Sequence, residues 1–175
     1  MRTAALALAL VACTRSEPVP QVPPPPSPEV QALKDAKPFI RVTGEQLIEA
    51  VKARDARFVV VNVWATWCGP CREEFPYVQS VTRSFADRGV DLIFVSTDFE
   101  EEEDAALEFL SEQGADLPSY IRTGKDGDFI QALNPEWGGA LPTTIIFDDQ
   151  GRRVRAWLGK VSETDLRNAL QELTS

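Results

Sequence analysis

The hydrophobic positions of this chain fall into continuous apolar runs and into runs with helical spacing. A continuous run rich in β-branched residues, bounded by polar residues, is typical of a strand buried on both faces. Strands are predicted at Phe39–Val42, Arg57–Ala65, Val90–Asp98 and Thr143–Asp148, and a turn joins the last of these to a hairpin partner at Arg152–Gly159. The two central runs are the most apolar, so we expect them in the middle of the sheet.

Runs with helical spacing lie between these strands. Thr43 and Gln46 match a capping box and open a helix to about Ala53, with Leu47, Ile48 and Val51 on one face. A second helix is predicted from about Cys71 to Arg88, and Pro76 inside it predicts a kink. Its core face consists of Phe75, Val78, Val81, Thr82 and Phe85. Further helices are predicted from about Glu101 to near Gly114 and, capped by Ser162, up to Leu173.

The segment from Ala115 to Gly139 is less regular. We expect a short strand around Tyr120 and Ile121 and a helical turn from Asp128 to Leu133. The main order is β-α-β-α-β-α-β-β-α, which predicts an α/β fold: a central mixed sheet with parallel crossovers, a C-terminal antiparallel hairpin and helices on both faces.

Composition narrows the possible functions. The chain has 175 residues, 43% of them hydrophobic, which is enough for one domain with a sizeable core. Its net charge of −9 argues against nucleic-acid binding and against electrostatic adhesion to anionic lipid. The chain has no histidine. Hydrolysis by Ser-His-Asp or Cys-His arrangements is therefore excluded.

The N-terminus has the features of a targeting segment. Arg2 is followed by a nine-residue apolar run, Ala4–Ala12, too short for a membrane span of roughly 20 residues but suited to a signal peptide. The run ends at Cys13 in a pattern that resembles a bacterial lipobox. We therefore expect residues 1–12 to be a lipoprotein signal peptide and Cys13 to be lipidated. The alternative is a hydrophobic tail with an incidental cysteine.

Proline dominates the next stretch. Seven of the eleven residues from Pro18 to Pro28 are proline, which favours extended polyproline II. We interpret residues 13–38 as the lipidated cysteine and a tether that holds a domain at 39–175 away from a membrane. A docking site for a proline-binding module is the alternative.

Two cysteines lie where a buried strand meets a helix. Cys68 follows the strand at Arg57–Ala65, and Cys71 lies one helical turn further along. Unpaired backbone N–H groups at a helix N-terminus carry positive partial charge and stabilise a thiolate, which is the reactive form. Pro70 fits a first helical turn because its missing N–H costs nothing there. This arrangement predicts redox chemistry.

Two other interpretations of the cysteine pair are weaker. A structural zinc site needs about four Cys or His ligands, and the chain has one further cysteine and no histidine. A purely structural disulfide across so short a loop would stabilise the chain little. We expect neither a metal nor a cofactor.

The stretch "NVWATWCGPCREEFP", from Asn62 to Pro76, resembles the active site of TlpA/ResA-like thiol-disulfide oxidoreductases, including Trp64, Trp67 and Glu74. The "LPTT" at 141–144 matches the cis-proline loop of that family, and residues 145–159 match its final hairpin. The resemblance covers residues 39–175. It implies a thioredoxin-like fold and an extracytoplasmic protein tethered to a membrane.

The resemblance also implies roles. Cys68 is the attacking nucleophile, Cys71 is the resolving thiol, and a cis Pro142 leaves the backbone of Leu141 available to an extended substrate. Residues implied to contact the substrate are Trp67, Gly69, Pro70, Leu141 and Thr143.

Glu74 is the candidate for proton handling. Asn62 stands six residues before Cys68, where cytoplasmic thioredoxins carry a buried aspartate. With no carboxylate at that position, Glu74, whose place carries a glutamate in the family that the stretch resembles, is the best candidate. The alternative is that Glu74 is an acid in the first helical turn, favoured by the helix dipole. We expect its neighbour Glu73 to be solvated.

Three other features have structural alternatives. We expect the acidic run Glu100–Asp104 to be an exposed helix N-terminus, with docking to a basic partner as the alternative. Trp137 is interpreted either as a rim of the substrate groove or as core packing. Arg72 is expected to face solvent, although its charge could favour a Cys68 thiolate.

Gly-Pro between the cysteines favours a reductant, since thioredoxin, with the same pair, has a potential of about −270 mV. We expect a monomer located in the periplasm or cell envelope. It is expected to reduce disulfides in client proteins, for example in cytochrome c maturation, and to be reduced again by a membrane dithiol donor. A disulfide oxidase or isomerase and a tethered, non-catalytic binding module are the alternatives. A peroxidase is disfavoured because the peroxidatic P-x-x-x-T-x-x-C pattern is absent.

Overall fold

The computed structural model describes residues 38–175. The predicted signal peptide, the lipidated Cys13 and most of the predicted tether lie outside these residues. The strands are β1 (Phe39–Val42), β2 (Phe58–Trp64), β3 (Val90–Ser96), β4 (Ser119–Arg122), β5 (Thr143–Asp148) and β6 (Arg153–Leu158). The helices are α2 (Gly44–Lys52), α3 (Gly69–Arg83), α4 (Glu103–Glu112), α5 (Asp126–Leu133) and α6 (Glu163–Leu173), with short 3₁₀ turns at Ala86–Arg88 and Glu100–Glu102.

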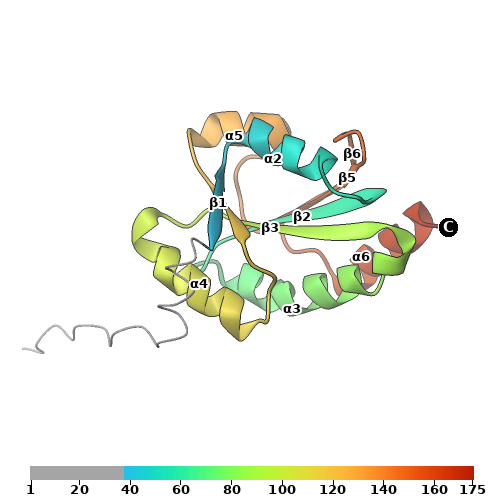
Figure 1. The fold of residues 1–175 in the computed structure, drawn as a ribbon, viewed down its shortest axis with the longest axis horizontal. Coiled ribbons are helices and arrows are strands. Elements are labelled where there is room, and N and C mark those ends of the chain that lie inside the picture. Colours follow the sequence, from blue (N-terminus) through green and yellow to red (C-terminus); the bar gives the residue numbers. More distant parts are fainter. Residues whose placement is uncertain (1–37) are drawn as a thin grey trace, which may run out of the picture.

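One six-stranded mixed sheet forms the centre of the protein (Figure 1). Its strand order is β1-β4-β3-β2-β5-β6. The first four strands in this order run parallel to one another, whereas β5 is antiparallel to both β2 and β6. Helices α2 and α5 cover one face, and α3, α4 and α6 cover the other. The predicted fold class is confirmed.

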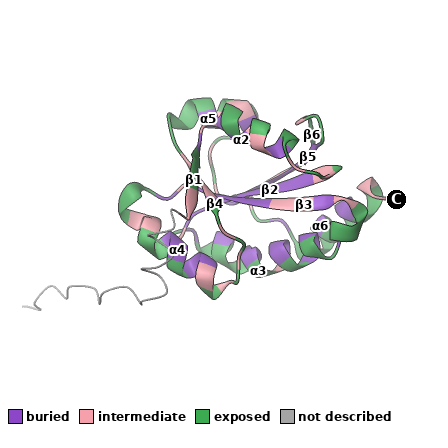
Figure 2. Ribbon diagram, in the orientation of Figure 1, coloured by how far each residue is buried: buried purple, intermediate pink, exposed green. Residues whose placement is uncertain are grey.

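The alternating side chains of β2 divide the core into two halves. Val59, Val61 and Val63 point to the face covered by α2 and α5. Val60 and Trp64 point to the face covered by α3. Because side chains alternate along a strand, Asn62 also points toward α3, although it is polar and fully buried. Figure 2 shows the central strands as almost entirely buried. The sheet therefore places one polar group under the helix that carries the cysteines.

The predicted helix caps are present. Thr43 and Gln46 form the capping box of α2, and the Ser162 side chain accepts a hydrogen bond from the backbone N–H of Asp165 at the start of α6. Gly44 at the start of α2 lies so close to α5 that a Cβ there would be 2.5 Å from the Cβ of Ala132. Glycine is thus required for the two helices to pack. Within residues 38–175, no helix has the length and apolar character to cross a membrane.

The predicted limits of the helix after Cys68 were wrong at both ends. The helix α3 begins at Gly69 rather than near Cys71, with Cys68 as its N-cap, and it ends at Arg83 rather than at Arg88. A 3₁₀ turn follows, and Gly89, with a φ of 77°, turns the chain into β3. Phe85 lies beyond the helix but remains buried in the core. The periodic pattern predicted one helix because α3 and Phe85, which directly precedes the 3₁₀ turn, place apolar side chains on the same buried face.

The two elements expected within the less regular segment 115–139 are both present. The short strand expected around Tyr120 and Ile121 is β4, and the helical turn expected from Asp128 to Leu133 is a two-turn helix, α5, that begins at Asp126. Strand β4 lies between β1 and β3, so it is an interior strand of only four residues. It has few apolar residues, which explains why its pattern was weak.

Candidate active site

The cysteine pair lies where β2 leads into α3. Cys68 and Cys71 form a disulfide with Cα atoms 5.2 Å apart. Cys68 is the N-cap of α3, and its sulfur accepts a hydrogen bond from the backbone N–H of Cys71 at 3.3 Å. Pro70 occupies the first turn, as expected. The amide of Cys71 in the first turn of the helix is thus directed at the sulfur of Cys68, where it favours negative charge.

An aromatic cluster packs beneath the start of α3. The rings of Trp64 and Phe75 meet edge to face with centroids 5.3 Å apart, and Phe109 of α4 lies 5.1 Å from each of them. Arg72 is exposed, but its guanidinium lies over the ring of Phe109 at 5.3 Å. Packing of this kind fixes the N-terminal turn of the helix and hence the position of the cysteines.

The predicted cis-proline loop leads into β5. The Leu141–Pro142 peptide bond is cis, as the resemblance implied, and the C=O of Pro142 accepts a hydrogen bond from Gly159 N–H. Thr143 is fully buried and its hydroxyl donates to the C=O of Trp157. Its side chain therefore faces the hairpin partner, in contrast to the exposed Trp67, Gly69 and Pro70 and the half-buried Leu141.

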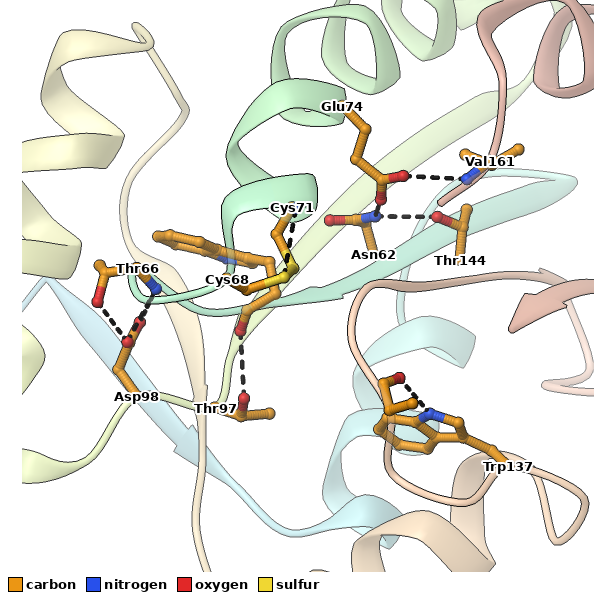
Figure 3. The surroundings of a disulfide bond; sticks show 12 residues. Asn62, Thr66, Cys68, Cys71, Glu74, Thr97, Asp98, Trp137, Thr144 and Val161 are labelled. Carbon is orange, nitrogen blue, oxygen red and sulfur yellow. Dashed lines mark hydrogen bonds between the residues drawn. A yellow bond between two sulfur atoms is a disulfide. The ribbon is translucent and has the colours of Figure 1, made fainter. Parts of the chain in front are cut away.

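Glu74 lies in a buried polar cluster. One carboxylate oxygen accepts a hydrogen bond from Asn62 Nδ2 at 2.6 Å, and the other accepts one from Val161 N–H at 3.0 Å. Asn62 Nδ2 also donates to the Thr144 hydroxyl at 2.9 Å (Figure 3). Burial raises the pKa of Glu74 to about 7, against the lowering effect of these two donors and of the charge on Lys160. Glu74 can therefore gain or lose a proton near neutral pH.

The structural alternative for Glu74, an acid in the first helical turn, was wrong. The first turn of α3 contains no acid, because the helix starts at Gly69 and Glu74 is its sixth residue. Glu74 is fully buried. The adjacent Glu73 is exposed and forms an ion pair with Lys160 at 2.5 Å. The two neighbouring glutamates thus differ completely in environment.

A second buried carboxylate went unnoticed in the sequence. Asp98, just beyond β3, accepts hydrogen bonds from the backbone N–H of Thr66 at 2.9 Å, from the Thr66 hydroxyl at 2.6 Å and from the Ser96 hydroxyl at 2.6 Å. Thr66 is two residues before Cys68. In Figure 3 this contact lies on the opposite side of the disulfide from Glu74. Its only sequence signal is an acid at the end of a predicted strand.

The remaining candidates have clear positions. Trp137 is buried, packs edge to face on Phe129, and donates a hydrogen bond from its indole N–H to the C=O of Ala140. Glu100 and Asp104 are exposed, whereas Glu103 forms an ion pair with Arg41. Among residues 38–175, no group of three or more His, Cys, Asp or Glu side chains could hold a metal ion.

The Redoxin family pattern matches residues 32–173, which is most of the chain. The chain belongs to the Redoxin family. Its curated relatives include the thiol-disulfide oxidoreductase ResA of Bacillus thuringiensis strain Al Hakam. The two are 28% identical over 147 residues, which cover 83% of this chain and 80% of that protein.

Solved structures of other proteins also resemble this chain. A thioredoxin-related protein from Neisseria meningitidis serogroup B is 28% identical, with a TM-score of 0.57 over 70% of this chain and 88% of that one. A secreted thiol-disulfide isomerase from Corynebacterium glutamicum is 27% identical, with a TM-score of 0.55 over 67% of this chain and 71% of that one. The thioredoxin-like fold predicted from the sequence is confirmed.

Proposed function

We propose that this chain is a membrane-tethered, extracytoplasmic thiol-disulfide oxidoreductase that reduces disulfides in client proteins. The single observation that supports this best is the Cys68–Cys71 disulfide at the N-terminus of α3, with Cys71 N–H directed at the Cys68 sulfur. The activity fits the relatives, which are named thiol-disulfide oxidoreductases.

The reaction is a two-step exchange of sulfur bonds. In the first step the Cys68 thiolate attacks one sulfur of a client disulfide, forms a mixed disulfide and expels one client thiolate. In the second step the Cys71 thiolate attacks the Cys68 sulfur, closes the Cys68–Cys71 disulfide and releases the second client thiolate. Two electrons pass from the protein to the client, and the two released thiolates take up protons.

Glu74 supplies the proton transfer that the second step needs. The resolving thiol of Cys71 must lose its proton before it attacks, and its sulfur lies in a buried environment. A carboxyl whose pKa is about 7 is matched to this task at neutral pH. Substrate positioning falls to the exposed residues around Cys68 and to the backbone of Leu141, which we propose pairs with an extended client segment.

The reduction potential separates a reductase from the alternatives. Equilibration of the full chain with glutathione or dithiothreitol, followed by quantification of the oxidised fraction, should give a value close to the −270 mV or so of thioredoxin. A value near the −120 mV or so of a strong oxidant would instead establish an oxidase. An isomerase, which the name of the Corynebacterium relative supports, would be recognised by recovery of scrambled disulfide substrates.

Clients can be identified by trapping. In Cys71→Ala the resolving thiol is absent, so Cys68 should remain bonded to its clients, which mass spectrometry of the captured complexes would identify. Cys68→Ser is the matched control and should capture none. If Cys68→Ser instead retains full function in cells, the protein is a binding module rather than an enzyme. Apocytochrome c with oxidised haem-attachment cysteines is the client class that we propose, and a membrane protein with an exposed dithiol is the proposed donor.

The proposed cellular arrangement has three parts: a signal peptide at 1–12, a lipidated Cys13 with a tether to residue 38, and the redox domain at 39–175. The monomeric domain would then work at the surface of a membrane in the periplasm or cell envelope. Cys13→Ala should move the protein from the membrane fraction to the soluble fraction. Retention of Cys13→Ala in the membrane fraction would rule out the lipid anchor.

A further inference from the structure

Three side chains of α3 bind the loop between β6 and α6. Glu73 forms an ion pair with Lys160, and the Glu74 carboxylate accepts a hydrogen bond from the Val161 N–H at 3.0 Å. The Tyr77 hydroxyl donates a hydrogen bond to the C=O of Val161 at 2.7 Å. The proposed disulfide exchange uses Glu74, but it does not by itself explain the contact made by Tyr77.

The backbone of Val161 is bound by α3 at both of its polar groups. Glu74 and Tyr77 are three positions apart on the helix, so their side chains lie on the same face. Glu74 accepts from the N–H of Val161, as Figure 3 shows, and Tyr77 donates to its C=O. Because only two soft dihedral angles separate these two groups, the bond to the C=O also restrains the direction of the N–H.

The rest of the loop is anchored on either side of Val161. The Gly159 N–H donates a hydrogen bond to the C=O of Pro142 at 2.9 Å, and Ser162 caps α6. The side chain of Val161 is buried in the core, which fixes its place but not the rotation of its peptide groups. The other donor to the buried carboxylate comes from β2, where the sheet holds the backbone. The N–H of Val161, in a loop, is the donor that depends on a side chain of α3.

We propose that Tyr77 is a positioning residue for proton transfer, whose hydroxyl holds Val161 so that the Val161 N–H stays bonded to Glu74. This inference rests on the proposed disulfide exchange, with Glu74 as its proton carrier. It adds a residue that sets the pH at which the exchange runs, and that acts through the backbone of a loop rather than on the reacting sulfurs.

The direction of the expected effect follows from the charge on Glu74. Burial raises the pKa of Glu74 to about 7, and the hydrogen bond from the Val161 N–H opposes this by stabilising the charged form. Removal of the Tyr77 hydroxyl weakens that bond, so Glu74 keeps its proton to a higher pH. The pH midpoint of a reaction that needs ionised Glu74 therefore rises.

Other groups around this cluster do not reverse that direction. Burial raises the pKa of Tyr77 to about 12, so Tyr77 is uncharged near neutral pH and its replacement by Phe changes a hydrogen bond rather than a charge. The contacts from β2 and β5 are the uncharged side chains of Asn62 and Thr144. The charged groups that act on Glu74 or Tyr77 stay in place in the variant: they are Lys160 from the loop, Glu73 on α3 and Glu163 at the start of α6.

The test is the pH profile of disulfide reduction in Tyr77→Phe, which removes the hydroxyl and keeps the ring. The full chain, reduced beforehand, is mixed with a peptide disulfide in a stopped-flow instrument at a series of pH values around neutrality. The midpoint should rise by about 0.5 to 1 pH unit, the scale of one weakened hydrogen bond to a charged group, and the limiting rate at high pH should be kept. Tyr120→Phe is the matched control. Tyr120 is also half-buried, its hydroxyl accepts a hydrogen bond from Arg54 at 3.4 Å, and its loss should leave the midpoint unchanged.

Two further measurements show whether Tyr77 acts through Glu74. The infrared absorption of the protonated carboxyl group, assigned by its loss in Glu74→Gln, gives the midpoint of Glu74 without turnover, and this midpoint should rise by the same amount in Tyr77→Phe. When Tyr77→Phe is added to Glu74→Gln, the rate at neutral pH should change by less than about twofold, because the group through which Tyr77 acts is absent.

An unchanged or lower midpoint in Tyr77→Phe would overturn the inference, as would a lower limiting rate at the wild-type midpoint, which is the result of general structural damage. Neither result touches the proposed function, provided that the wild type reduces the peptide disulfide and Glu74→Gln flattens its pH profile. If Glu74→Gln keeps the wild-type profile, Glu74 is not the proton carrier and the inference falls. If the wild type reduces no disulfide at all, the proposed function itself is wrong.

Discussion

Two buried carboxylates flank the disulfide, and they are held in different ways. Asp98 accepts hydrogen bonds from two hydroxyl groups and from a backbone N–H, all within the loop and strand end beside Cys68. Glu74 accepts one bond from an amide side chain and one from a backbone N–H, and burial brings its pKa to about 7. A carboxylate surrounded by donors serves as an anchor, whereas one with fewer donors in an apolar setting can exchange a proton.

The surroundings of Glu74 explain why it differs. It points from α3 toward Asn62, the single polar residue on the side of β2 that faces α3. In the described residues Asn62 Oδ1 has no hydrogen-bond partner. The Glu74 cluster therefore contains a buried acceptor without a hydrogen bond, whereas the oxygens of Asp98 are bonded by Thr66 and Ser96. We interpret the Glu74 cluster as the site of proton transfer and the Asp98 cluster as a support that fixes the Thr66–Cys68 segment.

The largest expected effect is on stability through Asp98. Asp98→Ala leaves the N–H and hydroxyl of Thr66 and the hydroxyl of Ser96 without their acceptor, and we expect the free energy of unfolding to fall by about 4 kcal/mol. Urea unfolding of the full chain measures this change. The control is Asp116→Ala, which removes an exposed ion pair with Arg83 and should cost less than about 0.5 kcal/mol. Similar losses in the two variants would contradict the anchoring role of Asp98.

Glu74 should instead make stability depend on pH. Between about pH 4.5 and pH 7 the folded protein keeps a proton on Glu74 that the unfolded chain has released, so this contribution to stability falls as pH rises. A shift from 4.5 to about 7 corresponds to a loss of up to about 3 kcal/mol across that range. Unfolding at several pH values should show this loss in the wild type and not in Glu74→Gln. The same slope in both proteins would show that Glu74 does not titrate in this range.

Catalysis should show the same contrast between Glu74 and its neighbour. Glu74→Gln keeps the shape of the side chain but cannot transfer a proton, so we expect disulfide reduction to slow by about 10- to 100-fold at pH 7, with a flatter pH profile. Glu73→Gln changes an exposed glutamate paired with Lys160 and should stay within about twofold of the wild type. Stopped-flow rates with a peptide disulfide provide the measurement. Equal slowing of the two variants would remove Glu74 from the mechanism.

The smallest expected effect concerns Thr144. Thr144→Val removes the hydroxyl that accepts a hydrogen bond from Asn62 Nδ2 while keeping the shape of the side chain. We expect a loss of stability of about 1 kcal/mol and only a small change in the pH midpoint of the reaction, since Thr144 does not contact Glu74 directly. A midpoint shift as large as the effect of Glu74→Gln would mean that the proton resides elsewhere in the cluster.

The sequence predicted the sheet well because its strands carry strong apolar patterns. Apart from one or two terminal residues, β2 and β5 lie where the runs Arg57–Ala65 and Thr143–Asp148 placed them. The strand β4 was weakly predicted, since pairing with two neighbours rather than local pattern stabilises it. The position of Cys68 at a helix N-terminus could be predicted because a helical pattern directly follows the strand that precedes it. The contacts of Asp98 with Thr66, 32 residues away, could not be predicted, because they depend on how β2 and β3 align.

The most direct test of the account is the pH dependence of Cys68 alkylation in Cys71→Ala, measured with iodoacetamide and mass spectrometry. The account holds that amide groups at the start of α3 stabilise the Cys68 thiolate. It predicts that the rate of alkylation rises with a midpoint below about pH 7.5, the upper end of the range for thiols at helix N-termini. A midpoint at or above about 8.5, as for an ordinary cysteine, would contradict it.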